Sequence, residues 1–120
     1  MKIAVIGAGA FGRAIHRMAI ASGPATLLGR AAGSGVETDW AKGADGADMI
    51  ALAVPAQKTR SVLRQIGGLA PSAPLILLAK GIELETGALQ AEIAAEEAPG
   101  RPPIIVTGPS FASEMMDGLP

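Results

Sequence analysis

The chain has 120 residues, no cysteine and a single histidine, which excludes disulfides, thiolate chemistry and multi-histidine metal sites. Ten basic and eleven acidic residues give a formal net charge of −1, so the sequence offers no electrostatic footprint for nucleic acid or an anionic membrane. Because 49% of residues are hydrophobic and no apolar run approaches the roughly 18 residues of a membrane-spanning helix, we expect one globular, cytoplasmic domain without a metal site.

Short apolar runs that end at turn signals alternate with helical patterns along the chain. Residues 2–6 predict a buried strand that stops at Gly7, and apolar residues at helical spacing then predict a helix that ends at Gly23. Four further strands are predicted at residues 26–28, 49–54, 75–79 and 103–107. Further helices are predicted over residues 62–69, from Thr86 onward, and after a Ser110 cap. This alternation predicts an α/β fold with a doubly wound, mainly parallel sheet and helices on both faces.

One glycine-rich segment departs from this pattern. Residues 29–46 contain five glycines, and only five residues separate Arg30 from Val36, whereas a parallel crossover needs about a dozen or more. A strand at residues 36–38 therefore cannot follow the second strand through an ordinary crossover helix. A shortened sheet edge, an irregular excursion and missing natural residues all fit, and we expect the third-strand region to be short.

The segment between the first strand and the first helix, residues 7–12, reads Gly-Ala-Gly-Ala-Phe-Gly. In a dinucleotide-binding loop with this spacing, the first glycine permits a tight turn and the second lets the backbone approach a pyrophosphate. The third allows close packing of helix on strand, and the helix N-terminus adds N–H groups and the positive end of its dipole. We therefore predict that Gly7, Gly9 and Gly12 bind a nucleotide cofactor.

The residue after the second strand predicts which cofactor this is. An NAD site places an acidic residue about 20 positions after the glycine loop, but no Asp or Glu occurs between Gly12 and Glu37. Arg30 stands there instead, and a guanidinium suits a 2′-phosphate. We therefore predict that NADP is preferred to NAD, with a solvated arginine at a strand end as the alternative.

Two more candidates follow later strands. Lys80 comes after residues 75–79, at the sheet edge where ligands bind, and can hold an anionic substrate or polarise a carbonyl; an ordinary surface lysine is the alternative. Gly108 and Ser110 follow the last strand, where Ser110 either donates to a ligand oxygen or only caps the next helix. The glutamates of residues 83–97 are interpreted as helix-entry and solvent-facing charges.

Four blocks of residues in this order are the glycine loop, Ala53-Val54-Pro55-Ala56-Gln57, Ala79-Lys80-Gly81-Ile82-Glu83 and Gly108-Pro109-Ser110-Phe111-Ala112. Together they resemble the N-terminal domain of bacterial NAD(P)-dependent glycerol-3-phosphate dehydrogenase. The resemblance implies a Rossmann-like fold and hydride transfer between sn-glycerol 3-phosphate and dihydroxyacetone phosphate, a phosphorylated substrate of phospholipid synthesis. Another small NADP-dependent reductase of a keto acid or imine, or a non-enzymatic nucleotide-sensing module, is the alternative.

The resemblance also implies roles for single residues and an extent for the domain. Contacts with the cofactor are expected from Ala10, Phe11, Arg30, Lys80 and Ala112, and contacts with the substrate from Lys80, Gly108 and Ser110. Residues 1–120 are expected to be the dinucleotide-binding domain alone, with the general base in a helical domain beyond Pro120 and little activity without it. A homodimer is one possible state of the full-length protein. Arg13 stands where the family usually has a small hydroxyl residue.

Overall fold

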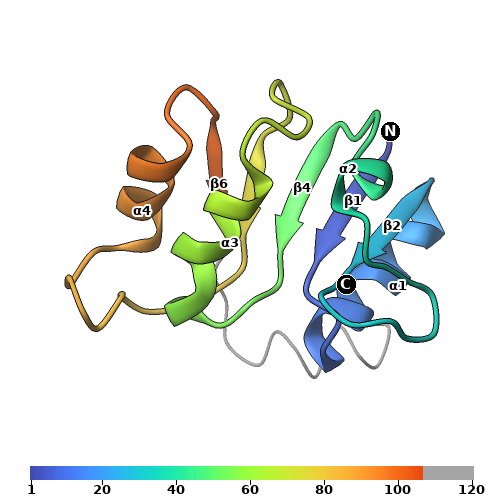
Figure 1. Ribbon diagram of the computed structural model, residues 1–120, viewed down its shortest axis with the longest axis horizontal. Helices are drawn as coiled ribbons and strands as arrows, with labels where there is room; N and C mark the ends of the chain where they lie inside the picture. Colours follow the sequence, from blue (N-terminus) through green and yellow to red (C-terminus); the bar gives the residue numbers. More distant parts are fainter. Residues whose placement is uncertain (107–120) are drawn as a thin grey trace.

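In the computed structural model, which describes residues 1–106, six parallel strands form one sheet between two layers of helices (Figure 1). The strands are β1 (Ile3–Ile6), β2 (Ala25–Leu28), β3 (Val36–Glu37), β4 (Met49–Leu52), β5 (Leu75–Leu77) and β6 (Pro103–Ile105). The helices are α1 (Ala10–Ser22), α2 (Trp40–Gly43), α3 (Thr59–Ile66) and α4 (Gln90–Glu97), with a 3₁₀ turn, η1 (Ala56–Lys58), before α3. The prediction of a doubly wound parallel sheet with helices on both faces is confirmed.

The order of strands in the sheet is β3-β2-β1-β4-β5-β6. The chain therefore builds outward from β1 through β2 to β3, and then crosses back to build outward from β4 on the other side of β1. Because every pair of neighbours is parallel, all strands end at the same edge of the sheet. Ligands of such sheets bind at this carboxyl edge, where the strand order reverses between β1 and β4.

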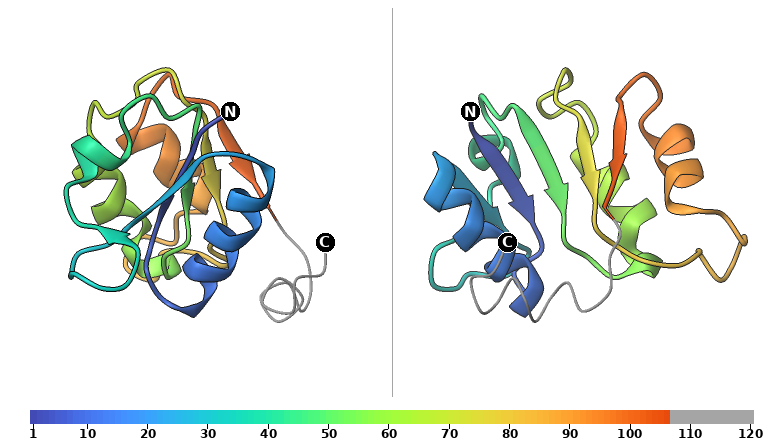
Figure 2. Two further views of the ribbon diagram at one scale, coloured as in Figure 1. Left: turned by 90° about the vertical axis from the view of Figure 1, so that its right-hand side faces the viewer. Right: turned by 180° about the vertical axis from the view of Figure 1, so that it is seen from behind.

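The two faces of the sheet are covered by different helices (Figure 2). Right-handed crossovers place α1 on one face and, after the reversal, α3 and α4 on the other. On the α1 face, Val5, Leu27 and Ala51 are buried beside Phe11 and Ile15 of the helix. The opposite face is the larger core, in which the buried strand residues pack against α2, α3 and α4. Within the described residues, no helix is long and apolar enough to cross a membrane.

Strand β3 is parallel to β2 although no helix joins them. The connection consists only of residues 29–35. The register pairs Leu27 with Val36 and Leu28 with Glu37, so β3 reaches only the last two residues of β2. The chain therefore has to turn back by two residues rather than by the length of a full strand, which a short loop can do. The expectation of a shortened third-strand region is confirmed.

The helix predicted from Thr86 begins four residues later, at Gln90, so that prediction is wrong at its start. The Thr86 hydroxyl donates to Glu83 Oε1 at 2.6 Å and accepts from the Ala88 N–H at 3.1 Å, which makes a turn rather than a first helical turn. Gly87 follows in the left-handed region, with φ +76°. Turn chemistry thus delays the helix. The end of the predicted strand 103–107 and the helix after Ser110 lie outside the described residues.

Arg101 stabilises a turn at the amino ends of the strands, opposite to the carboxyl ends where ligands bind. Its guanidinium donates to the carbonyl of Leu69 at 3.0 Å, to that of Ala70 at 2.6 Å and to that of Ala73 at 3.1 Å. These carbonyls belong to the turn between α3 and β5, where Ala70 has a positive φ of +41°. Partial burial lowers the pKa of Arg101. The side chain therefore donates to three backbone carbonyls and ties the turn to the residue that precedes β6 by two positions.

Two glutamates interpreted as solvent-facing charges are partners in a network instead. Glu83 is only 7% exposed, and Arg60 Nε donates to its two carboxylate oxygens at 3.1 and 3.0 Å. Glu97 accepts from Arg64 Nε at 3.0 Å and from Arg60 Nη1 at 2.7 Å. The hydrogen bond from Arg60 lowers the pKa of Glu83, and those from Arg64 and then Arg60 lower the pKa of Glu97. The network joins α3 to α4 and to the loop before it.

This network is expected to make folding stability depend on pH at the acidic end. A carboxyl whose pKa is lowered by folding contributes stability that is present above its unfolded pKa and lost as the pH falls through its folded pKa. Glu97→Gln should therefore lower the free energy of unfolding at neutral pH, and this deficit should shrink once the pH falls below the ordinary carboxyl pKa of 4.5. Urea unfolding of both proteins at neutral pH and at about pH 3.5 measures the deficit. An equal deficit at both values would contradict the assignment.

Candidate functional site

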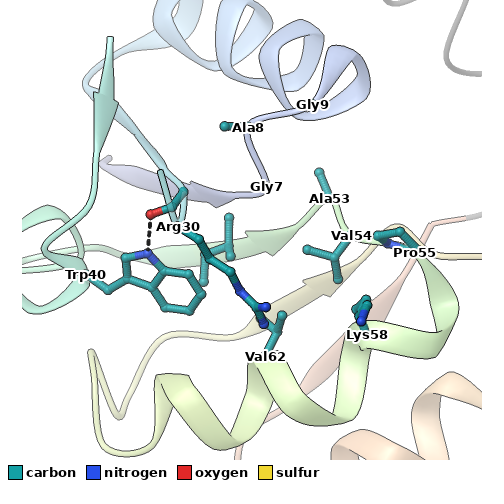
Figure 3. A pocket seen from close by; sticks show the side chains of 12 residues that line it. Gly7, Ala8, Gly9, Arg30, Trp40, Ala53, Val54, Pro55, Lys58 and Val62 are labelled. Carbon is teal, nitrogen blue, oxygen red and sulfur yellow. Dashed lines mark hydrogen bonds between the residues drawn. The ribbon is translucent and has the colours of Figure 1, made fainter. Parts of the chain in front are cut away.

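A cavity of about 360 Å³ lies at the carboxyl edge of the sheet, where the strand order reverses (Figure 3). Its walls come from the end of β1, from the segments that follow β1, β2 and β4, and from α2, η1 and α3. The lining residues are Ile6, Gly7, Ala8 and Gly9 at β1, Gly29 and Arg30 after β2, Ala53, Val54 and Pro55 after β4, and Trp40, Lys58 and Val62 at the helices. Both its position and its size are those of a small-molecule site in an open α/β sheet.

Two glycines of the loop are required by the backbone around them. Gly7 has φ +119°, and a Cβ built there would overlap the carbonyl oxygen of Ala53. Gly12 lies in the first turn of α1, where a Cβ would overlap the carbonyl oxygen of Gly7. The first glycine thus makes the turn out of β1, and the third lets α1 approach that turn closely.

Gly9, in contrast, faces open space. A Cβ built there would meet no atom within 4 Å, and the backbone is extended, with φ −77° and ψ −174°. As the N-cap of α1 it offers no capping side chain, and the first turn of this 13-residue helix contains no acidic residue. The backbone donors and the positive dipole end of α1 therefore lie beside an open cradle, which fits a pyrophosphate.

The rest of the cavity combines apolar walls with positive charge. Trp40 lies on one side, where its Nε1 donates to the Gly29 carbonyl at 3.0 Å, and Val54 and Val62 lie on the other (Figure 3). Arg30 and Lys58 are cations, and none of the twelve described lining residues is acidic. A largely apolar cavity with two cations in its lining suits an aromatic base that carries phosphates. Among residues 1–106, no cluster of His, Asp and Glu could hold a metal ion.

Arg30 extends across the cavity from the end of β2 (Figure 3). Its Nη2 donates to Gln65 Oε1 on α3 at 3.3 Å. A second hollow of about 460 Å³ shares Arg30 and Trp40 with the first and reaches Asp39. The Asp39 carboxylate is engaged elsewhere, because its Oδ1 accepts from the Lys42 N–H at 3.2 Å and caps α2. The guanidinium is thus placed between two hollows at the end of β2.

The structure brings some of the sequence-predicted residues together and not others. Gly7, Gly9 and Arg30 line the cavity, while Gly12 holds the loop in shape. Of the remaining candidates, Ala10 is exposed at the start of α1, Phe11 packs on the α1 face of the sheet, and Lys80 is exposed beyond β5 and is not among the lining residues. Gly108, Ser110 and Ala112 lie outside the described residues.

Sequence reasoning missed Trp40 and Lys58 as lining residues of the cavity. Trp40 comes from the glycine-rich segment, whose short helix α2 was not predicted, and only the turn through β3 brings it back beside Gly29. Lys58 ends η1 and looks from the sequence like any surface lysine. The one available signal was that Trp40 is the only tryptophan of a chain with very few aromatic residues.

Arg13, in the first turn of α1, joins two segments through its hydrogen bonds. Its Nε donates to the Ala8 carbonyl of the glycine loop at 3.1 Å, and its Nη1 donates to the Ser34 carbonyl at 3.0 Å. Ser34 belongs to the short β2–β3 connection, which also packs against the loop through Gly29. Arg13 therefore supports the connection from the helix that follows the glycine loop.

Arg13→Ala is expected to loosen this connection and to weaken NADPH binding by about fivefold, because two hydrogen bonds from a charged but exposed donor are lost. Hydrogen exchange of residues 29–35 and calorimetric titration of NADPH measure the two effects. Unaltered exchange in Arg13→Ala would contradict the role assigned to this side chain.

The reversed strand order, the glycine loop and the cavity beside it together define a dinucleotide-binding domain of the Rossmann type. The family model described as NAD-dependent glycerol-3-phosphate dehydrogenase N-terminus matches residues 34–120, and the chain belongs to this family.

Curated relatives carry the same name. The glycerol-3-phosphate dehydrogenase [NAD(P)+] of Zymomonas mobilis is 39% identical over 140 residues, which cover 98% of this chain and 41% of the relative. That of Brucella ovis is 37% identical over 144 residues, which cover 99% of this chain and 44% of the relative. The chain thus spans less than half the length of these relatives. Both alignments are longer than the chain itself, so the relatives contain residues that have no counterpart in it.

Solved structures show the same fold at lower identity. Glycerol-3-phosphate dehydrogenase from Coxiella burnetii matches with a TM-score of 0.82 and 22% identity over 99% of this chain and 44% of its own. The enzyme from Saccharomyces cerevisiae matches with a TM-score of 0.79 and 16% identity over 98% of this chain and 44% of its own. Plasmodium falciparum pyrroline carboxylate reductase, solved with NADP bound, has a TM-score of 0.65 at 17% identity over 88% of this chain and 41% of its own. This likeness concerns the fold alone.

Proposed function

We propose that this chain is the cofactor-binding domain of a glycerol-3-phosphate dehydrogenase, which interconverts sn-glycerol 3-phosphate and dihydroxyacetone phosphate with NADP in preference to NAD. The observation that carries the proposal is the cavity at the strand-order reversal, in a chain of this family. Its glycine loop leaves a cradle at the N-terminus of α1, and its lining includes the cations Arg30 and Lys58 but no acidic residue, since Asp39 lines only the neighbouring hollow. These features fit a ligand with an aromatic base and several phosphates.

The residues of the chain act mainly by binding and orienting. The backbone at Gly9 and the N-terminus of α1 hold the pyrophosphate, Trp40 and Val54 enclose the base, and Arg30 holds the 2′-phosphate. A bound nicotinamide supplies the group that gives or takes the hydride. Lys80, exposed beyond β5 at the same edge, orients the phosphorylated substrate and polarises its carbonyl.

Further residues and a second domain complete the proposed enzyme. Ala10, Phe11 and Ala112 contact the cofactor, and Gly108 and Ser110 face the substrate. Residues 1–120 form the dinucleotide-binding domain, and a helical domain supplies the general base and grips the substrate phosphate. The whole enzyme is cytoplasmic, forms a homodimer and provides a precursor for phospholipid synthesis.

Calorimetric titration of NADPH, and separately of NADH, into the purified 120-residue chain tests the proposal. We expect both to bind at one site, NADPH more tightly, because only NADPH carries the 2′-phosphate that Arg30 accommodates. Dihydroxyacetone phosphate added to the protein solution should change neither affinity much, because the proposed helical domain grips the substrate phosphate. Absence of binding by both nucleotides would overturn the proposal for this chain, and tighter binding of NADH would overturn the cofactor preference.

A further inference from the structure

The loop between β5 and α4, residues 78–89, is held by side chains of the segment that follows β4. Gln57 of η1 uses both ends of its carboxamide: Nε2 donates to the Ile82 carbonyl at 2.9 Å, and Oε1 accepts from the Leu84 N–H at 2.9 Å. One side chain thereby pairs with two backbone groups on either side of Glu83, as a neighbouring strand does.

Further contacts reach the same few residues. Arg60 Nε donates to the two carboxylate oxygens of Glu83, the residue between those that Gln57 holds. Gln90, which is 6% exposed, places its Nε2 at 3.3 Å from the Gly81 carbonyl and 3.5 Å from the Ala56 carbonyl. Gln57 and Arg60 therefore hold the loop from one side, and Gln90 bridges it to η1 from the start of α4.

Apolar packing holds the two ends of this loop but not its middle. Ile82 and Leu84 expose 42% and 78% of their surface, so the side chains next to Glu83 gain little from burial. Gly81 precedes them with φ +92°. Because a glycine has more backbone freedom than other residues in the unfolded chain, ordering this position costs additional entropy. The position of the middle of the loop thus depends on polar contacts, which are the backbone hydrogen bonds within the loop and the contacts from Gln57, Arg60 and Gln90.

The segment that holds the loop also forms a wall of the nucleotide cavity. Pro55 and Lys58 line the cavity, and Gln57 lies between them in the sequence. A ligand that contacts this wall therefore orders the turn from which Gln57 reaches the loop. Lys80 is directly before Gly81, at the end of that loop nearest to β5.

We propose that Gln57 is a positioning residue that couples the nucleotide cavity to the loop carrying Lys80, so that nucleotide binding orders this loop. The coupling rests on the proposed function, because it takes the cavity as the nucleotide site. The holding of the loop by Gln57 stands on the contacts alone.

Gln57→Ala, with and without NADPH, tests both parts by hydrogen exchange and by labelling of lysine amines. In the variant, exchange of residues 81–86 should be about fivefold faster, the loss expected for one net backbone hydrogen bond. In the parent chain NADPH should slow that exchange and reduce labelling of Lys80, and in the variant both responses should be lost while the affinity for NADPH changes by less than about threefold.

The matched control is Ser61→Ala on α3, which removes a hydroxyl that donates only to the Lys58 carbonyl at 3.0 Å and should behave as the parent does. Gln57→Glu keeps an acceptor for the Leu84 N–H but loses the donor to Ile82, and should show part of the same loss. Unchanged exchange of residues 81–86 in Gln57→Ala would overturn the proposal. If the parent chain binds no NADPH, the proposed function fails, and the exchange without ligand still decides whether Gln57 holds the loop. If NADPH binds and the responses at the loop and Lys80 persist in Gln57→Ala, the coupling is overturned.

Discussion

Arg30→Ala is expected to weaken NADPH binding by tenfold to one hundredfold and to leave NADH binding nearly unchanged. Hydrogen bonds to a charged group contribute about 1.5–3 kcal/mol, and about 1.4 kcal/mol corresponds to a tenfold change in affinity. The guanidinium at the end of β2 extends across the cavity, and the Asp39 carboxylate nearby is engaged in capping α2. Calorimetric titration of both nucleotides into the parent and the variant measures the ratio of the two affinities.

Gln65→Ala is the control for this experiment, because it removes the side chain that Arg30 contacts at 3.3 Å and keeps the guanidinium. The preference for NADPH should persist there, and it should decrease with added salt in the parent, since the interacting charges are exposed. Equal losses of NADPH and NADH affinity in Arg30→Ala would mean that Arg30 shapes the cavity without binding the 2′-phosphate.

Gly12→Ala is expected to destabilise the chain by about 3 kcal/mol and to abolish nucleotide binding. The added methyl group overlaps the Gly7 carbonyl oxygen, which is backbone and has no rotamer to move away, so α1 has to shift from the loop. Urea unfolding measures the stability, and the titrations described above measure the binding.

Gly9→Ala provides a contrast on the same loop. The methyl group there meets no atom within 4 Å and the φ of −77° is ordinary, so the folded chain should lose no more than about 1 kcal/mol. Nucleotide affinity should nevertheless fall by tenfold or more, because the methyl group enters the space assigned to the pyrophosphate. Unaltered affinity in a folded Gly9→Ala chain would show that phosphates lie elsewhere.

The frame of this fold could be predicted because its signals are local. Every described strand except β3 is a short, mainly apolar run, and Gly7 and Gly12 mark the turn and the close approach that the structure shows. The late start of α4 was missed because Thr86 hydrogen-bonds to Glu83 instead of beginning a helix. Local patterns report the propensity of a segment but not the partners that a side chain finds in the folded chain.

The candidate site was less accessible from the sequence, for a physical reason. Trp40 and Lys58 enter the cavity only through the arrangement of β3 and η1, and neither belongs to a motif. Glu83 was interpreted as a solvent-facing charge because its partner, Arg60, lies on α3, 23 residues earlier in the chain. The binding roles of the loop glycines, Ala10, Phe11, Arg30, Lys80 and the candidates after β6 remain predictions.

The short β2–β3 connection accounts for the role of Arg13, which holds it in place. A full crossover helix would rest on the sheet through its own apolar side, whereas residues 29–35 form no helix. The connection is instead tied by Arg13, from α1, at the carbonyl of Ser34. A long charged side chain can thus take the place of an element of secondary structure at the edge of a sheet.

The hydrogen bonds of Arg101 at the far edge of the sheet also bear on how such a chain tolerates change. This guanidinium fixes a turn at the amino ends of the strands, where the chain enters β5. The glycine loop, Arg30 and the loop of Lys80 all follow the opposite ends of the strands. Substitutions at the amino ends of the strands therefore affect mainly the stability of the fold, and substitutions at the carboxyl ends affect mainly which ligand is bound. The two properties can evolve, or be engineered, separately.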